Sequence, residues 1–112
     1  MTIIETRIAI VDDEEPVRTM LRRVLQLAGY EVAMFASGEA FLASLAEAQP
    51  ACAILDVHLP KLSGLDVHRC LGEMRIDVPV VFITASDDSV LEERVRREHA
   101  SALLRKPFSS AA

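Results

Sequence analysis

The chain has 112 residues, of which 51% are hydrophobic and 26% are charged, and its formal net charge is −5. This composition excludes an intrinsically disordered chain, and the length allows one compact domain with a single core. The acidic balance gives no support to binding of nucleic acid or of a membrane surface by this chain.

The first strand and helix are predicted from an apolar run followed by helical spacing. Residues Arg7 to Val11, RIAIV, form the run that predicts a strand. Pro16 suits the first turn of a helix, and apolar residues then recur every three or four positions as far as Ala28. Gly29 follows and predicts the end of the helix.

The second unit repeats this pattern. Residues 30–35, YEVAMF, predict a second strand. Ser37 is a suitable N-cap for a helix that we expect to run to about Ala48. Pro50 is expected to end that helix, because proline is not tolerated in a helix interior.

A third strand is predicted over residues 52–55, CAIL, whose continuous apolar character is typical of a strand buried on both faces. A third helix is expected to begin at Ser63 or Gly64. The fourth strand is predicted over residues 78–84, VPVVFIT, with Pro79 near its start.

The last part of the chain predicts one more helix and one more strand. Residues 86–99 have helical spacing but only a thin apolar stripe, so we expect a weakly anchored helix that shifts easily. Residues 101–104, SALL, predict a short fifth strand. The remaining KPFSSAA is too short for a full closing helix, so the fifth helix is expected to be truncated or absent.

Alternation of strands with single crossover helices predicts an α/β fold with a parallel sheet covered on both faces. Five units are too few to close an eight-stranded barrel. Right-handed crossovers therefore favour a doubly wound arrangement of three layers. We expect a five-stranded sheet in the flavodoxin-like order 2-1-3-4-5.

Two features bear on the cellular compartment. Cys52 and Cys70 lie in apolar surroundings without CxxC spacing, which predicts a reducing cytoplasm rather than a disulfide or zinc site. The sequence lacks both an export signal at its start and an apolar run of about 18 residues, so we expect no membrane association.

Polar residues stand where the predicted strands end. Asp12 and Asp13 follow the first strand, Asp56 follows the third, Thr84 ends the fourth, and Lys106 comes just after the fifth. Ligands of open parallel sheets bind beyond these carboxyl ends, where the strand order reverses. We therefore expect three carboxylates, a hydroxyl and an ammonium group to converge there.

Each of these residues has a simpler interpretation when it is taken alone. Asp12 and Asp13 could cap the first helix, and Lys106 could be an ordinary surface lysine. Three carboxylates in one place repel one another unless a cation lies among them, and an all-oxygen ligand set suits Mg²⁺. Metal, hydroxyl and ammonium are the groups that stabilise a phosphoryl group, so Asp56 is predicted to be the nucleophile of a phosphoryl transfer.

The motifs IVDDEEPVR, ILDVHLPKLSGLD, VVFITAS and LLRKPF, in this order and at these spacings, resemble the receiver domain of two-component response regulators. The resemblance covers about residues 7–108. It implies that Asp56 accepts a phosphoryl group from a phosphohistidine of a sensor histidine kinase or phosphotransfer protein. It further implies that Mg²⁺ is bound directly by Asp13 and Asp56, through water by Asp12, and by the main-chain carbonyl of His58.

The same resemblance assigns roles to residues near the other strand ends. Thr84 and Lys106 would bind phosphoryl oxygens, and the peptide bond before Pro107 would be cis. His58 and Ser86 occupy the two positions that tune self-hydrolysis in this family. An output domain for transcription regulation is typical of similar proteins.

The sequence departs from the family pattern in two places. Leu103 stands where the family usually has a tyrosine or phenylalanine that turns inward when the threonine moves. The usual threonine–aromatic switch is therefore in doubt. Without a fifth helix, the surface through which phosphorylated receivers pair is incomplete, which leaves a homodimer as an open possibility.

Two alternatives use the same fold class. A small phosphohydrolase with an aspartate nucleophile, similar to haloacid-dehalogenase-type phosphatases, would need a DxD motif at the first strand, where this chain has DD. A flavodoxin-like flavin binder would need aromatic residues around the ring, and the chain has one tyrosine and no tryptophan. A phosphoacceptor switch, rather than a turnover enzyme, is therefore the preferred prediction.

Overall fold

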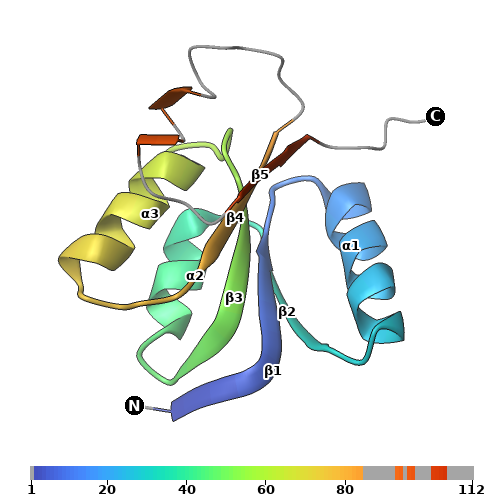
Figure 1. The fold of residues 1–112 in the computed structure, drawn as a ribbon. Helices are drawn as coiled ribbons and strands as arrows, with labels where there is room; N and C mark the ends of the chain where they lie inside the picture. The colour runs from blue at the N-terminus through green and yellow to red at the C-terminus, as the bar shows by residue number, and fades with distance from the viewer. Residues whose placement is uncertain (1, 85–92, 95, 98–101, 106–112) are drawn as a thin grey trace.

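The computed structural model describes residues 2–84, 93–94, 96–97 and 102–105. Its labelled elements are β1 (Thr2–Val11), α1 (Glu15–Leu27), β2 (Glu31–Phe35), α2 (Gly38–Ser44), β3 (Ala48–Asp56), α3 (Gly64–Glu73), β4 (Val80–Thr84) and β5 (Ala102–Arg105). The strands form a central sheet, with α1 on one side and α2 and α3 on the other (Figure 1).

All four strand pairs are parallel, and the sheet order is β2-β1-β3-β4-β5. The predicted fold class and the 2-1-3-4-5 order are therefore confirmed. In the register, Val11 of β1 pairs with Leu55 of β3, and Asp56 of β3 pairs with Ile83 of β4. The carboxyl ends of β1, β3 and β4 consequently meet at one edge of the sheet.

The second strand–helix unit differs from the prediction. The helix α2 ends at Ser44 rather than near Ala48, and β3 begins at Ala48 rather than at Cys52. Pro50 therefore lies inside a strand and does not end the helix. It is tolerated because the described β3–β4 pairing starts only at Ala53, so Pro50 lies in a stretch that pairs with β1 alone.

The first strand is also longer than predicted. It starts at Thr2, and residues 2–4 pair with residues 48–50 of β3, with a register shift between Ile4 and Ile8. This early pairing draws residues 48–50 into the sheet. Long-range pairing therefore overrides the helical propensity of the sequence that follows α2.

The helices α1 and α3 begin where the sequence indicates. Pro16 lies in the first turn of α1, and α3 begins at Gly64 after Ser63. The Ser63 hydroxyl accepts a hydrogen bond from the Asp66 backbone N–H at 3.1 Å, and an Asp66 carboxylate oxygen accepts one from the Ser63 N–H at 3.1 Å. This capping box satisfies two backbone donors at the start of the helix.

The main core lies between the sheet and the helices α2 and α3. It contains fourteen buried side chains from the sheet, these helices and their loops: Ala9, Val11, Phe41, Leu45, Ala53, Leu55, Val57, Leu59, Leu65, Val67, Leu71, Val78, Val80 and Phe82. The core holds β3 as the central strand and so fixes the position of Asp56 at its end. In the part of the chain that the structure describes, no helix has the length and apolar character needed to cross a membrane.

Most of the predicted helix at 86–99 lies outside the described residues. Residues 93–94 and 96–97 are helical, and Arg96 forms an ion pair with Glu93 at 2.9 Å on their exposed surface. The expected mobility of this helix, and the fifth helix expected to be truncated or absent after β5, concern residues that the structure does not describe.

Candidate functional site

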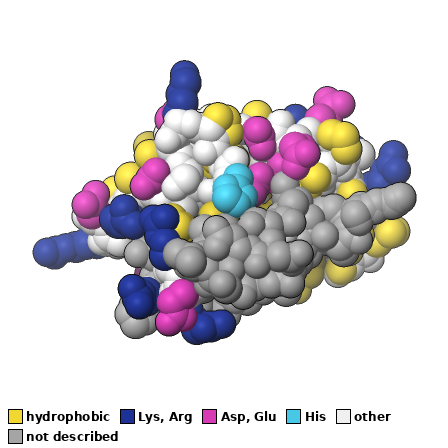
Figure 2. All heavy atoms as spheres, turned by 90° about the horizontal axis from the view of Figure 1, so that it is seen from above, with side chains coloured by type: hydrophobic (Ala, Val, Ile, Leu, Met, Phe, Trp, Pro, Cys, Tyr) yellow, Lys and Arg dark blue, Asp and Glu magenta, His cyan; other side chains and the backbone are white. Residues whose placement is uncertain are grey.

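Three carboxylates gather at the carboxyl edge of the sheet. One carboxylate oxygen each from Asp12, Asp13 and Asp56 lies within 4.8 Å of the other two. Asp12 and Asp56 are buried, with 0% and 3% of their surface exposed, whereas Asp13 is exposed. Figure 2 looks down on this edge, where acidic side chains lie beside a histidine. The predicted convergence of these three residues is confirmed.

Asp12 is held by hydrogen bonds through its main chain and its side chain. Its N–H donates to the Phe35 carbonyl of the neighbouring strand at 3.1 Å. Its Oδ1 accepts from the Glu14 N–H at 2.8 Å, and its main-chain carbonyl accepts from Arg18 Nη1 at 2.7 Å. The side-chain bond closes the short loop between β1 and α1 in the manner of an Asx turn.

Asp56 ends β3 and is also tied to the loop that follows it. Its Oδ1 accepts a hydrogen bond from the His58 N–H at 3.0 Å. The Val57 N–H donates to the Ile83 carbonyl at 3.0 Å, which continues the β3–β4 pairing one residue past Asp56. The carboxylate is therefore mounted at the end of the central strand of the sheet, while the exposed His58 stands beside it.

The loop after Asp56 returns tightly to the end of β3. The Gly64 N–H donates to the Val57 carbonyl at 3.1 Å, and Lys61 adopts a left-handed conformation with φ of 62°. A β-carbon on residue 64 would lie 2.4 Å from the Asp56 carbonyl oxygen. Only glycine permits this approach, so Gly64 is more than the turn marker that the sequence indicates.

Thr84 lies at the end of β4, one residue beyond the partner of Asp56, and it is fully buried. The predicted strand-end position of this hydroxyl is confirmed. Lys106, Ser86 and the peptide bond before Pro107 lie outside the described residues. Leu103 pairs with Phe82 in the β4–β5 register.

The donor set at this edge fits a hard divalent cation. Carboxylate oxygens are the ligands that Mg²⁺ prefers, and Mg²⁺ is commonly held by one or two protein carboxylates together with water and phosphate oxygens. Three carboxylates within 4.8 Å also repel one another, so a cation among them lowers the electrostatic energy of the cluster. Arg18, whose bond to Asp12 no sequence motif suggested, supplies a nearby positive charge.

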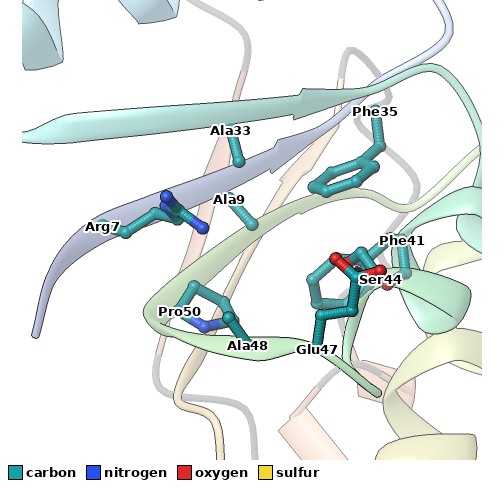
Figure 3. A pocket seen from close by; sticks show the side chains of 9 residues that line it. All are labelled: Arg7, Ala9, Ala33, Phe35, Phe41, Ser44, Glu47, Ala48 and Pro50. Atoms are coloured by element: carbon teal, nitrogen blue, oxygen red, sulfur yellow. Dashed lines mark hydrogen bonds between the residues drawn. The ribbon is translucent and has the colours of Figure 1, made fainter. Parts of the chain in front are cut away.

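A hollow of about 110 Å³ lies between the sheet and α2, away from the carboxylates (Figure 3). Ala9 and Ala33 form its floor, and the rings of Phe35 and Phe41 meet edge to face at 5.6 Å on one side. Its lining has none of the strand-end residues predicted for the chemistry.

Comparison with known proteins identifies the family. The family model described as "Response regulator receiver domain" matches residues 8–112. The chain is 36% identical over 99 residues to the transcriptional regulatory protein FixJ of Rhizobium meliloti, which covers 88% of this chain and 48% of FixJ. It is 40% identical over 105 residues to the response regulator MprA of Mycolicibacterium vanbaalenii, which covers 92% of this chain and 45% of MprA.

Solved structures agree with this result. The crystal structure of FixJ-N superimposes with a TM-score of 0.84 at 34% identity and covers 96% of this chain and 86% of that chain. The response regulator StyR gives a TM-score of 0.83 at 34% identity and covers 95% of this chain and 54% of that chain. The chain thus belongs to the response regulator receiver domain family, and it spans about half the length of the relatives FixJ and MprA.

Membership of this family makes the domain a phosphoacceptor signalling switch rather than a turnover enzyme. The alternatives of a small phosphohydrolase and of a flavin binder are accordingly set aside.

Proposed function

We propose that Asp56 is the residue that accepts the phosphoryl group, from a phosphohistidine of a sensor histidine kinase or of a phosphotransfer protein. The observation that carries this proposal is the convergence of Asp12, Asp13 and Asp56 within 4.8 Å at the carboxyl edge of the sheet. Among the three, Asp56 lies at the end of the central strand and has Thr84 at the end of the adjacent strand.

In the proposed reaction, a carboxylate oxygen of Asp56 forms a bond to phosphorus while the phosphorus–nitrogen bond of the phosphohistidine breaks. The electron pair of that bond returns to the imidazole nitrogen, and the product is an acyl phosphate. Self-hydrolysis reverses the modification when a water oxygen attacks phosphorus and releases phosphate, which restores the carboxylate. His58, exposed beside Asp56, and Ser86 are proposed to set the access of that water.

Mg²⁺ is the proposed cofactor, and Asp12, Asp13, Asp56 and the main-chain carbonyl of His58 are the groups that would hold it. When bound, it supplies neutralisation of the negative charge on the phosphoryl oxygens. Thr84 is proposed to donate its hydroxyl to a phosphoryl oxygen, and Lys106 is proposed to add a positive charge. Both contributions are electrostatic and act by position rather than by bond making.

Several broader statements complete the proposal. Residues 1–112 are taken to act as one receiver domain in the cytoplasm, where Cys52 and Cys70 stay reduced. An output function in transcription regulation is proposed because the relative FixJ is named a transcriptional regulatory protein and is about twice as long. Homodimer formation on phosphorylation is proposed as one way in which the switch is read.

The test is incubation with acetyl phosphate, with and without Mg²⁺, followed by intact-mass measurement. The protein is expected to gain one phosphoryl group only when Mg²⁺ is present, and Asp56→Asn is expected to gain none. Asp77→Asn is the matched control, because it makes the same chemical change at an exposed carboxylate in the loop before β4. An adduct that persists in Asp56→Asn would overturn the assignment of the nucleophile.

A further inference from the structure

Arg18 reaches back from α1 to the loop that carries two of the three carboxylates. Its Nη1 donates to the main-chain carbonyl of Asp12 at 2.7 Å, in a partly buried position. A hydrogen bond from a charged donor at this distance is stronger than one between neutral groups. The contact therefore joins the second half of the first helical turn firmly to the end of β1.

The carbonyl that Arg18 holds belongs to the peptide unit between Asp12 and Asp13. On the other side of Asp12, its N–H is bound to Phe35 at 3.1 Å. The Glu14 N–H, two residues on, is bound to the Asp12 carboxylate at 2.8 Å. Together with Arg18, these bonds fix the plane of the peptide unit that leads into Asp13.

Asp13 depends on this backbone more than its neighbours do. Asp12 and Asp56 are buried, so surrounding atoms restrict their side chains, whereas Asp13 is exposed. Its place within 4.8 Å of the other two carboxylates is therefore set mainly by the main chain that precedes it. A change in the Asp12–Asp13 peptide plane would move the Asp13 carboxylate out of the cluster.

We propose that Arg18 is a positioning residue for this carboxylate cluster: by holding the Asp12 carbonyl, it aims Asp13 at the cation that the cluster binds. This inference rests on the function proposed above. It assigns to Arg18 a structural effect on metal binding that is opposite in sign to the effect of its charge.

The two effects can be separated because they change metal affinity in opposite directions. A positive charge beside three carboxylates repels a cation, so removal of that charge alone would tighten Mg²⁺ binding. Loss of the bond to Asp12 would release Asp13 and weaken Mg²⁺ binding. Residues that orient metal ligands typically change affinity by about 10- to 100-fold when they are replaced, so the positioning effect is expected to dominate.

Three variants test this. Arg18→Met keeps much of the apolar stem and removes both charge and donors. Arg22→Met removes the same charge one turn further along α1. Arg18→Lys keeps a charge and a donor but lacks the planar guanidinium, so an intermediate result is expected.

The first measurement uses the metal-free protein. Amide hydrogen exchange at Glu14, whose N–H bonds the Asp12 carboxylate, is expected to accelerate in Arg18→Met and to stay at the wild-type rate in Arg22→Met. Unchanged exchange in Arg18→Met would contradict the inference, whether or not the domain accepts phosphate. Wild-type exchange rates in the core strands verify that each variant is folded. If Arg18→Met does not fold, Arg18→Lys replaces it, and a wild-type exchange rate there would count against the proposal.

The second measurement is Mg²⁺ affinity by calorimetric titration. Arg18→Met is expected to bind Mg²⁺ about 10-fold more weakly than the wild type, and Arg22→Met is expected to bind it as tightly or more tightly. If Arg18→Met binds Mg²⁺ as tightly as the wild type or more tightly, Arg18 acts on the metal only through its charge, and the inference is overturned. A wild-type protein that binds no Mg²⁺ and takes up no phosphoryl group from acetyl phosphate would instead overturn the proposed function.

Discussion

Gly64 offers a direct way to perturb the site without touching a charged group. A β-carbon at this position would lie 2.4 Å from the Asp56 carbonyl oxygen and 3.0 Å from the Asp56 carbonyl carbon and the Val57 Cα. All three are backbone atoms at the end of β3, so no side-chain rotation relieves the clash. Since a carbon–oxygen contact is comfortable at about 3.3 Å, Gly64→Ala requires the loop or the strand end to move by roughly 0.9 Å.

This displacement predicts two losses. Inserting a methyl group into a packed position typically costs about 1–3 kcal/mol of unfolding free energy, and urea unfolding should report a loss in that range. A misplacement of about 1 Å near a reacting group can reduce a rate by about 100-fold. Phosphoryl uptake from acetyl phosphate should therefore slow by about this factor, measured by intact mass over time.

Gly72→Ala is the matched control on the same helix. Gly72 is exposed in α3, and an added β-carbon meets no heavy atom within 4 Å. Alanine is preferred over glycine in a helix interior by about 0.5–1 kcal/mol, so this variant should be slightly more stable and should accept phosphate at the wild-type rate. If Gly64→Ala behaves like Gly72→Ala in both assays, the steric argument is wrong.

Three further predictions concern parts of the molecule outside the carboxylate cluster. Ser63→Ala removes the N-cap of α3 and should lower the unfolding free energy by about 1 kcal/mol in urea. The Ser63 backbone N–H, followed by its hydroxyl, holds the pKa of the Asp66 carboxyl below its ordinary value of about 3.9. The ionised Asp66 carboxylate therefore stabilises the folded protein fully above about pH 3.9, and this contribution is lost as the pH falls toward the lower pKa that Asp66 has in the folded state. Asp66→Asn should consequently flatten the decline of the unfolding free energy below about pH 4. Burial raises the pKa of the Cys52 thiol, and alkylation at pH 8 should be slower at Cys52 in the folded protein than in urea-unfolded protein; equal rates would contradict this.

The succession of strands and helices could be predicted from the sequence because local patterns encode it, and the order of the strands in the sheet then followed from a common doubly wound arrangement. Short apolar runs and helical spacing each depend on neighbouring residues, and the handedness of crossovers then restricts the topology. The boundaries of α2 and β3 could not be predicted in this way. They depend on the pairing of residues 2–4 with residues 48–50, which are more than forty positions apart in the chain.

The candidate site likewise has features that the sequence predicts and features that only the structure reveals. The positions of Asp12, Asp13 and Asp56 follow from the ends of predicted strands, and the structure brings them together as expected. Which of the two adjacent aspartates is buried does not follow from the sequence DD. Asp12 is buried because its N–H still bonds to Phe35, as a residue of the sheet does, whereas Asp13 has already left the sheet.

This difference in burial explains why the exposed Asp13 carboxylate depends for its position on a residue outside the Asp12–Asp13 pair. A buried carboxylate at a strand end takes its orientation from the atoms packed around it. An exposed carboxylate in a three-residue loop takes its orientation from the loop, and Arg18 is the side chain that holds the loop carbonyl. The aspartates therefore supply the chemical groups of the site. Its geometry also depends on Arg18 in the first turn of α1 and on Gly64, which allows the loop after β3 to pack against the end of that strand.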